Sequence, residues 1–226
     1  MDEHAILSGY DIWAPSYDDR DPSTWLDEPF LLAQLRPYPG CRILDVGCGT
    51  GRYLRRLRSD LHRVVAVDVS QGMLARARGD TKGGRRISWV QASATSLPFL
   101  PQSFDRVMSG LVLDHIRNVE EFFNQISLVL AANGRAIVAG VHPEMQRLTG
   151  AEIQVSTNVA RAHLAGHIHE VSDLVAAAQR AQLQVHAVEE PPVTQGMVDR
   201  RPAWSYKLGR PALVLLSLQH GRQVTK

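Results

Sequence analysis

A short glycine-rich run constrains the fold of this chain more than any other feature. The apolar residues of Arg42–Val46 predict a strand, and three glycines follow it at alternate positions, Gly47, Gly49 and Gly51. Glycine has no Cβ, so the backbone can turn sharply there and approach a ligand closely. Because residues 52–59 are predicted to be helical, the run indicates a nucleotide-binding corner made of a strand, a tight turn and a helix N-terminus.

The spacing of these glycines favours one kind of nucleotide ligand over another. The dinucleotide fingerprint is Gly-x-Gly-x-x-Gly, with a pyrophosphate at the helix N-terminus. Here the pattern is Gly-x-Gly-x-Gly, and Asp45 lies two positions before the first glycine. The difference disfavours a nicotinamide oxidoreductase, which we keep as an alternative.

Predicted strands and helices alternate along most of the chain, which is typical of a parallel sheet with helices on both faces. Helices are predicted near 119–131, with Asn133-Gly134 as a C-terminal stop, and near 170–181. Residues 142–169 and 190–210 have weak periodicity, and we expect loops there that build a substrate pocket. The predicted strands cover residues 41–46, 64–68, 87–91, 104–109, 135–141, 183–189 and 212–218.

Composition is ordinary for a globular protein, with 44% hydrophobic residues in a chain of 226. No segment approaches the roughly 20 apolar residues that a membrane-spanning helix needs. The N-terminus is acidic and lacks a signal-peptide pattern. Cys41 and Cys48 are expected to be reduced thiols, because a disulfide at Cys48 would distort the glycine run. We therefore expect a cytoplasmic protein.

The small net charge of +2 hides an asymmetric distribution along the chain. Residues 1–30 carry eight acids against one arginine, and residues 52–86 carry ten basic residues against three acids. The basic block could be a patch for RNA or an anionic substrate. The favoured interpretation is that it forms the solvated outer faces of two helices.

Three motifs occur in order: Asp45–Gly51, then Val64–Ser70, then Leu97-Pro98-Phe99 followed by Ser103–Val107. Together they resemble the class I S-adenosylmethionine-dependent methyltransferases, in particular the small-molecule, quinone-biosynthesis-like enzymes of the methyltransferase type 11 group. The resemblance covers roughly Tyr10–Gly140. It implies an α/β fold with a Rossmann-like, seven-stranded, mostly parallel sheet and helices on both faces, in which the last strand is antiparallel and lies between the fifth and the sixth.

One domain is expected over residues 1–226, because the sequence shows no internal repeat or linker. We divide it into an N-terminal helical lid (1–40), a cofactor-binding half (41–141) and a substrate-side half (142–226). The cofactor that the resemblance implies is S-adenosyl-L-methionine, with S-adenosyl-L-homocysteine as its product.

The resemblance also implies which residues contact the cofactor. Asp68 ends the second strand and is expected to accept hydrogen bonds from the ribose hydroxyls; the alternative is a helix cap, a role that Ser70 also fits. Asp45 is expected to hold the ammonium group, directly or through water. The other expected contacts are Tyr17, Gly47, Gly49, Gly51, Met73, Ser93, Ala94 and Ser109.

Two of these contacts have alternatives. Ser93 stands where family members often carry an acid that accepts from the adenine amino group; its hydroxyl can still accept, without the assistance of charge. Met73 could pack on the adenine face, or it could simply belong to the buried face of the following helix.

Two histidines are candidates for a general base, which a hydroxyl acceptor needs as the methyl group arrives. His115 is the first candidate, although it could instead seal the pocket or bond to the backbone. His142 is the second and is also an expected substrate contact. The remaining expected substrate contacts are Tyr10, Trp13 and His167.

The aromatic residues near the N-terminus resemble the lid segment of small-molecule methyltransferases. A ring there could cover the sulfonium through a cation–π contact, or it could anchor an N-terminal helix. Farther along, His163, His167 and His169 with Glu170 have metal-like spacing, but we favour pocket-lining or exposed residues and predict no metal.

The sequence thus predicts methyl transfer from S-adenosylmethionine to a small-molecule acceptor, first of all at oxygen, by in-line displacement. No Asn/Asp-Pro-Pro-Tyr/Phe motif follows the fourth strand, which argues against base amines and glutamine side chains as acceptors. A tRNA or rRNA methyltransferase and a non-catalytic cofactor-binding protein stay open as alternatives. The expected partner is a small molecule rather than a membrane or nucleic acid, and the expected state is a monomer or homodimer.

Overall fold

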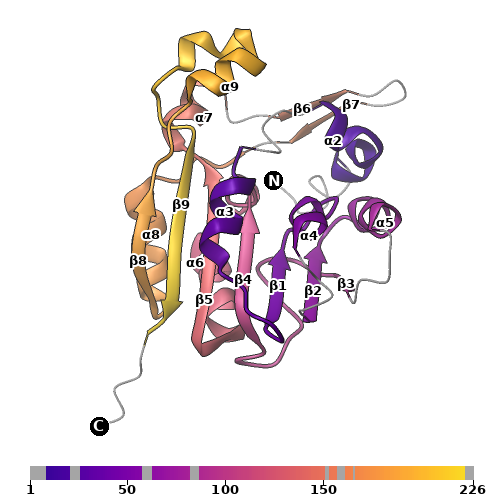
Figure 1. The fold of residues 1–226 in the computed structure, drawn as a ribbon, viewed down its shortest axis with the longest axis vertical. Helices are drawn as coiled ribbons and strands as arrows, with labels where there is room; N and C mark the ends of the chain where they lie inside the picture. The colour runs from indigo at the N-terminus through magenta and orange to yellow at the C-terminus, as the bar shows by residue number, and fades with distance from the viewer. Residues whose placement is uncertain are drawn as a thin grey trace.

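A seven-stranded sheet in the order β3-β2-β1-β4-β5-β9-β8 is the centre of the fold (Figure 1). The computed structural model describes residues 9–20, 26–57, 63–81, 87–150, 153–156, 161–164 and 166–221. The parallel strands are β1 (Arg42–Val46), β2 (Arg63–Asp68), β3 (Ile87–Gln91), β4 (Phe104–Gly110) and β5 (Leu130–Val141).

The last strand along the chain, β9, runs opposite to the other strands of the sheet. β9 (Leu213–His220) runs antiparallel to both of its neighbours, β5 and β8 (Leu183–Glu189). This confirms the predicted Rossmann-like sheet, including the antiparallel strand between the fifth and the sixth. The carboxyl ends of β1, β2 and β4 therefore meet at one edge of the sheet, where ligands bind in folds of this kind.

Helices cover both faces of the sheet and enclose two separate apolar cores. One core lies under α3 (Glu28–Leu35), α4 (Arg52–Arg56) and α5 (Gln71–Asp80). The other lies under α6 (Val119–Val129) and α8 (Val171–Arg180). Successive strand residues point to opposite faces. Ile43 of β1 accordingly belongs to the first core and Leu44 to the second.

The end of α6 differs from the prediction. The helix begins after Asn118, whose side chain accepts from the N–H groups of Glu120 and Glu121. It ends at Val129, and Asn133-Gly134 lies inside β5 rather than stopping the helix. Leu130 is buried and pairs directly with β4, so the chain becomes extended at once. Phe104 of β4 pairs with Leu130, and Arg106 pairs with Arg135, so β5 has more residues than β4 in this interval. The register of the two strands shifts there.

The two regions expected to be loops contain short elements, which lie above the sheet in Figure 1. Short elements bury few residues, which is why their sequences show weak periodicity. These elements are α7 (Pro143–Thr149), β6 (Ile153–Ser156) paired with β7 (Arg161–Leu164), α9 (Gln195–Arg200) and the 3₁₀ helix η4 (Pro202–Lys207). Within the described residues, no helix combines the length and apolarity needed to cross a bilayer.

The region predicted as a lid divides into two parts. Residues 9–20 are helical, with the 3₁₀ turn η1 (Ala14–Ser16) and α2 (Tyr17–Arg20), and they lie near α4 and α5 (Figure 1). We call them the N-terminal segment. The helix α3 instead packs on β4 and β5. Of the described parts of this region, the N-terminal segment is therefore the one placed to cover the edge where β1 and β2 end.

Candidate active site

The glycine turn after β1 has the backbone geometry that its residues predict. Gly47, Gly49 and Gly51 have φ angles of 71°, 53° and 75°, a region that favours glycine over residues with a side chain. The turn is fastened to the end of β2, because the N–H groups of Gly47 and Cys48 both donate to the Val67 carbonyl, at 2.8 and 2.9 Å. The start of α4 is thus held against the end of β2.

Asp68 lies at the centre of this arrangement. Its Oδ2 accepts from the Gly49 N–H at 2.8 Å, and its Oδ1 accepts from the Ser70 N–H at 2.9 Å. Burial raises its pKa, which these backbone hydrogen bonds and the nearby His115 partly counteract. Ser70, not Asp68, caps α5 by accepting from the Met73 N–H. Each carboxylate oxygen keeps a lone pair that can accept from a ligand.

A cavity of about 110 Å³ opens at this edge of the sheet and collects most of the predicted contacts. Its walls come from the glycine turn, from the ends of β2, β3 and β4, and from the N-terminal segment. The predicted residues that line it are Tyr10, Tyr17, Gly47, Gly49, Asp68, Met73, Ser93, Ala94 and His115. Ser93 also contacts the Thr95 hydroxyl, at 3.0 Å.

Three predicted cofactor contacts lie outside the walls of this cavity. Ser109 is fully buried and donates to the Val46 carbonyl at 2.9 Å, so it joins β4 to β1. Gly51 is the N-cap of α4, and a Cβ built on it would lie 3.2 Å from the Trp89 ring. The third, Asp45, is fully buried on the face of β1 that Ile43 shares, toward α4.

The carboxyl group of Asp45 is unsatisfied in the described residues, since neither oxygen has a hydrogen-bond partner there. Desolvation raises its pKa to about 8; Arg52 opposes this, whereas Asp68 and Asp27 add to it. A buried polar group without a partner is costly. An ammonium group bound above the glycine turn, directly or through water, would satisfy it, so this residue fits the expected cofactor.

The N-terminal segment covers the cavity with aromatic rings. Tyr10 and Tyr17 line it, and the Trp13 ring packs behind them, with centroids 5.9 Å from Tyr10 and 4.7 Å from Tyr17. Trp13 is buried and clusters with Leu164 of β7, so it supports the wall rather than facing a ligand. The expected substrate contact of Trp13 is therefore indirect in this geometry.

His115 ends the 3₁₀ turn η3 (Leu113–His115) and borders the cavity. Its Nε2 lies 2.5 Å from the Tyr10 hydroxyl oxygen and 3.6 Å from Asp114 Oδ2. Its Nδ1 is buried and has no hydrogen-bond partner among the described residues. The imidazole is thus held at one nitrogen, and the other has no hydrogen-bond partner among the described residues.

His142 does not reach the acceptor side as expected. Its Nδ1 accepts from the Glu144 N–H at 3.1 Å, which caps α7, and its Nε2 lies 2.7 Å from Glu190 Oε2. It lines neither this cavity nor the one described below. Both ring nitrogens already have protein partners, because the chain uses this histidine to start a helix after β5.

His167 and His169 lie near each other, with ring centroids 6.2 Å apart. His167 borders an open groove that shares Ser93 and His115 with the cavity, and desolvation lowers its pKa. His169 Nε2 lies 2.7 Å from the Ile116 carbonyl oxygen. Among the residues that the structure describes, no three His, Cys, Asp or Glu side chains are arranged to hold a metal ion. The side chain of His163 lies outside the described part.

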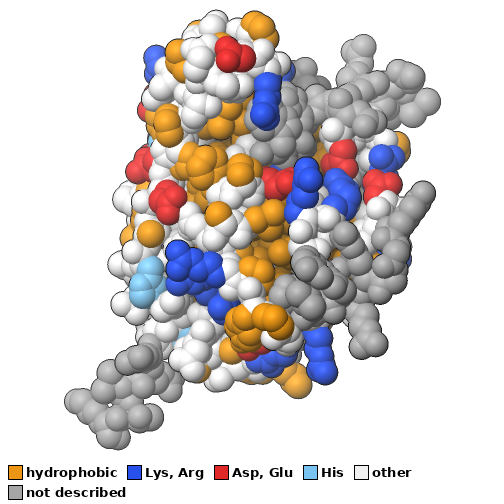
Figure 2. All heavy atoms as spheres, in the orientation of Figure 1, with side chains coloured by type: hydrophobic (Ala, Val, Ile, Leu, Met, Phe, Trp, Pro, Cys, Tyr) orange, Lys and Arg blue, Asp and Glu red, His pale blue; other side chains and the backbone are white. Residues whose placement is uncertain are grey.

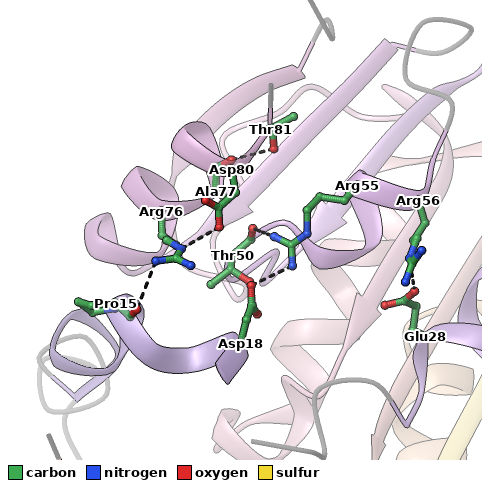
Figure 3. A network of polar contacts seen from close by, with 10 residues as sticks. All are labelled: Pro15, Asp18, Glu28, Thr50, Arg55, Arg56, Arg76, Ala77, Asp80 and Thr81. Atoms are coloured by element: carbon green, nitrogen blue, oxygen red, sulfur yellow. Dashed lines mark hydrogen bonds and ion pairs between the residues drawn. The ribbon is translucent and has the colours of Figure 1, made fainter. Parts of the chain in front are cut away.

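Several described arginines of the basic block form ion pairs with acids of this chain, an arrangement that the sequence pattern does not predict. Arg55 pairs with Asp18 at 2.9 Å, and Figure 3 shows both beside Thr50. Figure 3 also shows the pairs Arg56–Glu28 and Arg76–Asp80, at 2.9 and 2.7 Å. Basic and acidic side chains are accordingly interspersed on the face drawn in Figure 2. The described arginines in these pairs are poorly placed to form a continuous phosphate track.

A buried polar network beneath the cavity was also missed. Arg52 donates to both oxygens of the fully buried Asp27, at 2.7 and 3.1 Å, and the Tyr53 hydroxyl donates to the same carboxylate. Arg52 also lines the cavity. The only sequence signal was that an acid-rich N-terminal region and a basic block occur in the same chain. That signal does not show which acid pairs with which arginine.

A second cavity, of about 170 Å³, adjoins the first, and Leu111 lines both. It lies among the segments that follow β5 and β8. Its polar lining residues are Asp114, Gln146, Thr149 and Lys207. Its apolar lining includes Leu26, Val141, Met145, Val193, Trp204, Ala212 and Leu213. The first cavity has the features of a nucleoside site, and the second shares Leu111 with it.

The fold, the glycine turn and the acid at the end of β2 define a Rossmann-like nucleoside-binding protein. Residues 44–138 match a sequence family described as a methyltransferase domain. The chain is 36% identical over 138 residues to a demethylmenaquinone methyltransferase of Clavibacter sepedonicus, covering 59% of this chain and 56% of that protein. It is 32% identical over 181 residues to a malonyl-[acyl-carrier protein] O-methyltransferase of Halorhodospira halophila, covering 76% and 60%.

The chain thus spans less than two thirds of the length of these two curated relatives. Among solved structures, an S-adenosylmethionine-dependent methyltransferase from Mesorhizobium loti aligns with a TM-score of 0.70 and 25% identity, over 86% of this chain and 97% of that one. Together with the site, these matches support the resemblance to the class I S-adenosylmethionine-dependent methyltransferases and the cofactor that the motifs predicted.

Proposed function

We propose that this chain transfers the methyl group of S-adenosylmethionine to a hydroxyl oxygen of a small molecule. The observation that carries the proposal is the first cavity, where a turn of three positive-φ glycines and Asp68 meet at the carboxyl edge of β1 and β2. The names of the two curated relatives, which include a quinone precursor and an acyl-carrier-bound acid, support a non-nucleic-acid acceptor. The paired arginines of the basic block support the same choice.

Different residues around the first cavity would bind different parts of the cofactor. Asp68 accepts from the ribose hydroxyls with the lone pairs that Gly49 and Ser70 leave free. Met73, Ser93 and Ala94 lie where the adenine ring would rest. The bare backbone at Gly49 gives room for the methionine part, since a Cβ there would meet nothing within 4 Å. Asp45, below the turn, attracts the ammonium group.

When bound, the cofactor supplies an electrophilic methyl group for in-line displacement. Tyr10 and Tyr17 cover the cavity and exclude water, and their ring faces attract a positive charge. His115 accepts the proton of the acceptor hydroxyl at Nδ1, the ring nitrogen that has no hydrogen-bond partner among the described residues. The Tyr10 hydroxyl at Nε2 keeps the imidazole oriented while this occurs.

Asp68→Asn is expected to weaken S-adenosylmethionine binding by about 1–3 kcal/mol, roughly 5- to 150-fold in Kd, because charged acceptors for the ribose are lost. Isothermal titration calorimetry on the purified protein measures this directly. Asp80→Asn is the matched control, since Asp80 is exposed at the end of α5 and pairs only with Arg76 in the described contacts. Unchanged affinity, or uptake of a pyridine dinucleotide in place of the sulfonium nucleoside, would contradict the proposal.

A second prediction concerns Asp45. Its pKa of about 8 means that it is largely protonated at pH 7, so binding of an ammonium group is expected to release up to about one proton. Calorimetry in two buffers of different ionisation enthalpy counts that proton, and Asp45→Asn should abolish it.

The same shift makes the stability of the cofactor-free protein depend on pH. Because the folded pKa lies above the ordinary value of 3.8, the contribution of Asp45 to stability is fully present below pH 3.8 and is lost as the pH rises through about 8. Asp45→Asn should lose this slope in urea unfolding at pH 5 to 8. Equal proton release or equal slopes in both proteins would refute a buried, protonated Asp45.

A further inference from the structure

The second cavity holds a positive charge that the methyl-transfer site does not use. Lys207 ends η4, lines this cavity and is only 8% exposed. Its Nζ lies 4.9 Å from the centroid of the Trp204 ring and 5.5 Å from that of Tyr206. In the part of the chain that is described, no carboxylate lies within ion-pair distance of it. Burial and the nearby Arg201 lower its pKa, so its surroundings disfavour the charge.

A buried ammonium group is costly unless an anion pairs with it. Aromatic faces attract a cation without neutralising it. We propose that the methyl acceptor carries a carboxylate that pairs with Lys207 in the second cavity, which makes the substrate class a small hydroxy acid. The inference rests on the proposed function and names the substrate of the same site.

The second cavity limits the size and polarity of the acceptor apart from its carboxylate. Its volume of about 170 Å³ is close to the roughly 150 Å³ of an apolar cavity that binds benzene. Met145, Val193 and Trp204 are among its walls, and most of its other lining residues are apolar as well. The body of the acceptor is therefore apolar and about the size of one ring or a short chain.

The two cavities also orient the acceptor. Leu111 borders both, Asp114 lines the second and His115 lines the first. Asp114 and His115 both belong to η3, so polar side chains meet at this end of the cavity. The hydroxyl end then lies at η3, beside His115, and the carboxylate lies at η4. The carboxylate is thus a recognition group and the hydroxyl is the methyl acceptor.

The charges of the cavity favour a carboxylate over a phosphate. Lys207 is the one cationic side chain among the described residues that line it, and Asp114 contributes an acid. A single negative charge matches one ammonium group, whereas a phosphate dianion would leave excess negative charge near Asp114. Phosphate recognition typically uses arginine forks or several donors.

The test uses the full chain saturated with S-adenosylhomocysteine and measures the binding of two probe pairs by calorimetry. The acids are 4-hydroxybenzoate and 4-hydroxyphenylacetate, and each is compared with its neutral amide. We expect the wild type to bind at least one acid about tenfold or more tightly than its amide. Lys207→Met should remove this preference and leave amide affinity unchanged, whereas Lys207→Arg should restore most of it.

Arg201→Met is the matched control. The Arg201 guanidinium also lies over the Trp204 ring, at 5.2 Å, but the side chain is exposed and does not line the cavity. This variant should keep the preference for the acid. Equal binding of acid and amide by the wild type, no binding of either acid, or a preference that survives in Lys207→Met would overturn the inference.

The cofactor experiment separates this inference from the proposed function. S-adenosylhomocysteine binding is measured first on every variant, and it also reports that Lys207→Met is folded. If the wild type does not bind this nucleoside, the proposed function fails. If it binds the nucleoside but shows no preference for a carboxylate, only the assignment of Lys207 fails.

Discussion

His115→Ala is expected to lower kcat by about 10²- to 10⁴-fold, the usual contribution of a general base. The Kd for S-adenosylhomocysteine should change by less than about threefold, because the nucleoside contacts lie on Asp68 and the glycine turn. The physical reason is geometric: the imidazole is held at Nε2 by Tyr10 and presents an unpartnered Nδ1. Turnover is measured as S-adenosylhomocysteine formation with the acid that binds best.

Two controls separate proton transfer from structural support. Free imidazole added to His115→Ala should recover at least about tenfold in kcat, since the removed ring leaves a space of its own shape. His142→Ala should lose about 1 kcal/mol of stability, from the lost cap of α7, and keep its kcat. If His115→Ala turns over normally, the acceptor needs no base, and transfer to a carboxylate becomes the better description.

The sheet was predictable because each of its strands has a strong local signal. Buried parallel strands are continuous apolar runs, as in Val64–Val67, and the helices α6 and α8 carry a clear apolar stripe. The glycine turn was predictable for a related reason, since positive φ angles at alternate positions call for residues without a side chain.

The orientation of two predicted cofactor contacts does not follow from their position at a strand end. Ser109 and Asp45 lie next to the binding edge along the chain, but each points into the protein. The period-2 alternation of β1 puts Asp45 on the same face as Ile43, toward α4, and not into the cavity. Nearness in sequence to a strand end therefore does not decide which side of the sheet a residue faces.

Contacts between distant segments could not be predicted from local patterns. Asp11 accepts from the Ser70 hydroxyl at 2.6 Å and from the Gly72 N–H at 2.8 Å, and Asp18 pairs with Arg55. These acids fasten the N-terminal segment across α4 and α5. The charge asymmetry of the sequence thus reflects contacts within the chain, a third explanation beside a nucleic-acid patch and solvated helix faces.

Gly110→Ala is expected to lower the free energy of unfolding by about 3–5 kcal/mol, with a fall in Tm of roughly 10 °C. A Cβ built on Gly110 would lie 1.7 Å from the Tyr53 hydroxyl oxygen and 2.6 Å from Asp27 Oδ2. The added methyl group must displace that hydroxyl, which leaves the fully buried Asp27 with Arg52 as its remaining side-chain partner. Urea unfolding and thermal melts measure the loss.

Gly79→Ala is the matched control, because a Cβ there meets nothing within 4 Å and alanine favours the helix by about 0.5–1 kcal/mol. Similar unfolding curves for Gly110→Ala and Gly79→Ala would mean that the network tolerates displacement. Arg52 and Gly110 both line the first cavity, so the network that stabilises the fold also shapes the cofactor site. Gly110→Ala should therefore weaken S-adenosylhomocysteine binding even at temperatures where the variant is fully folded.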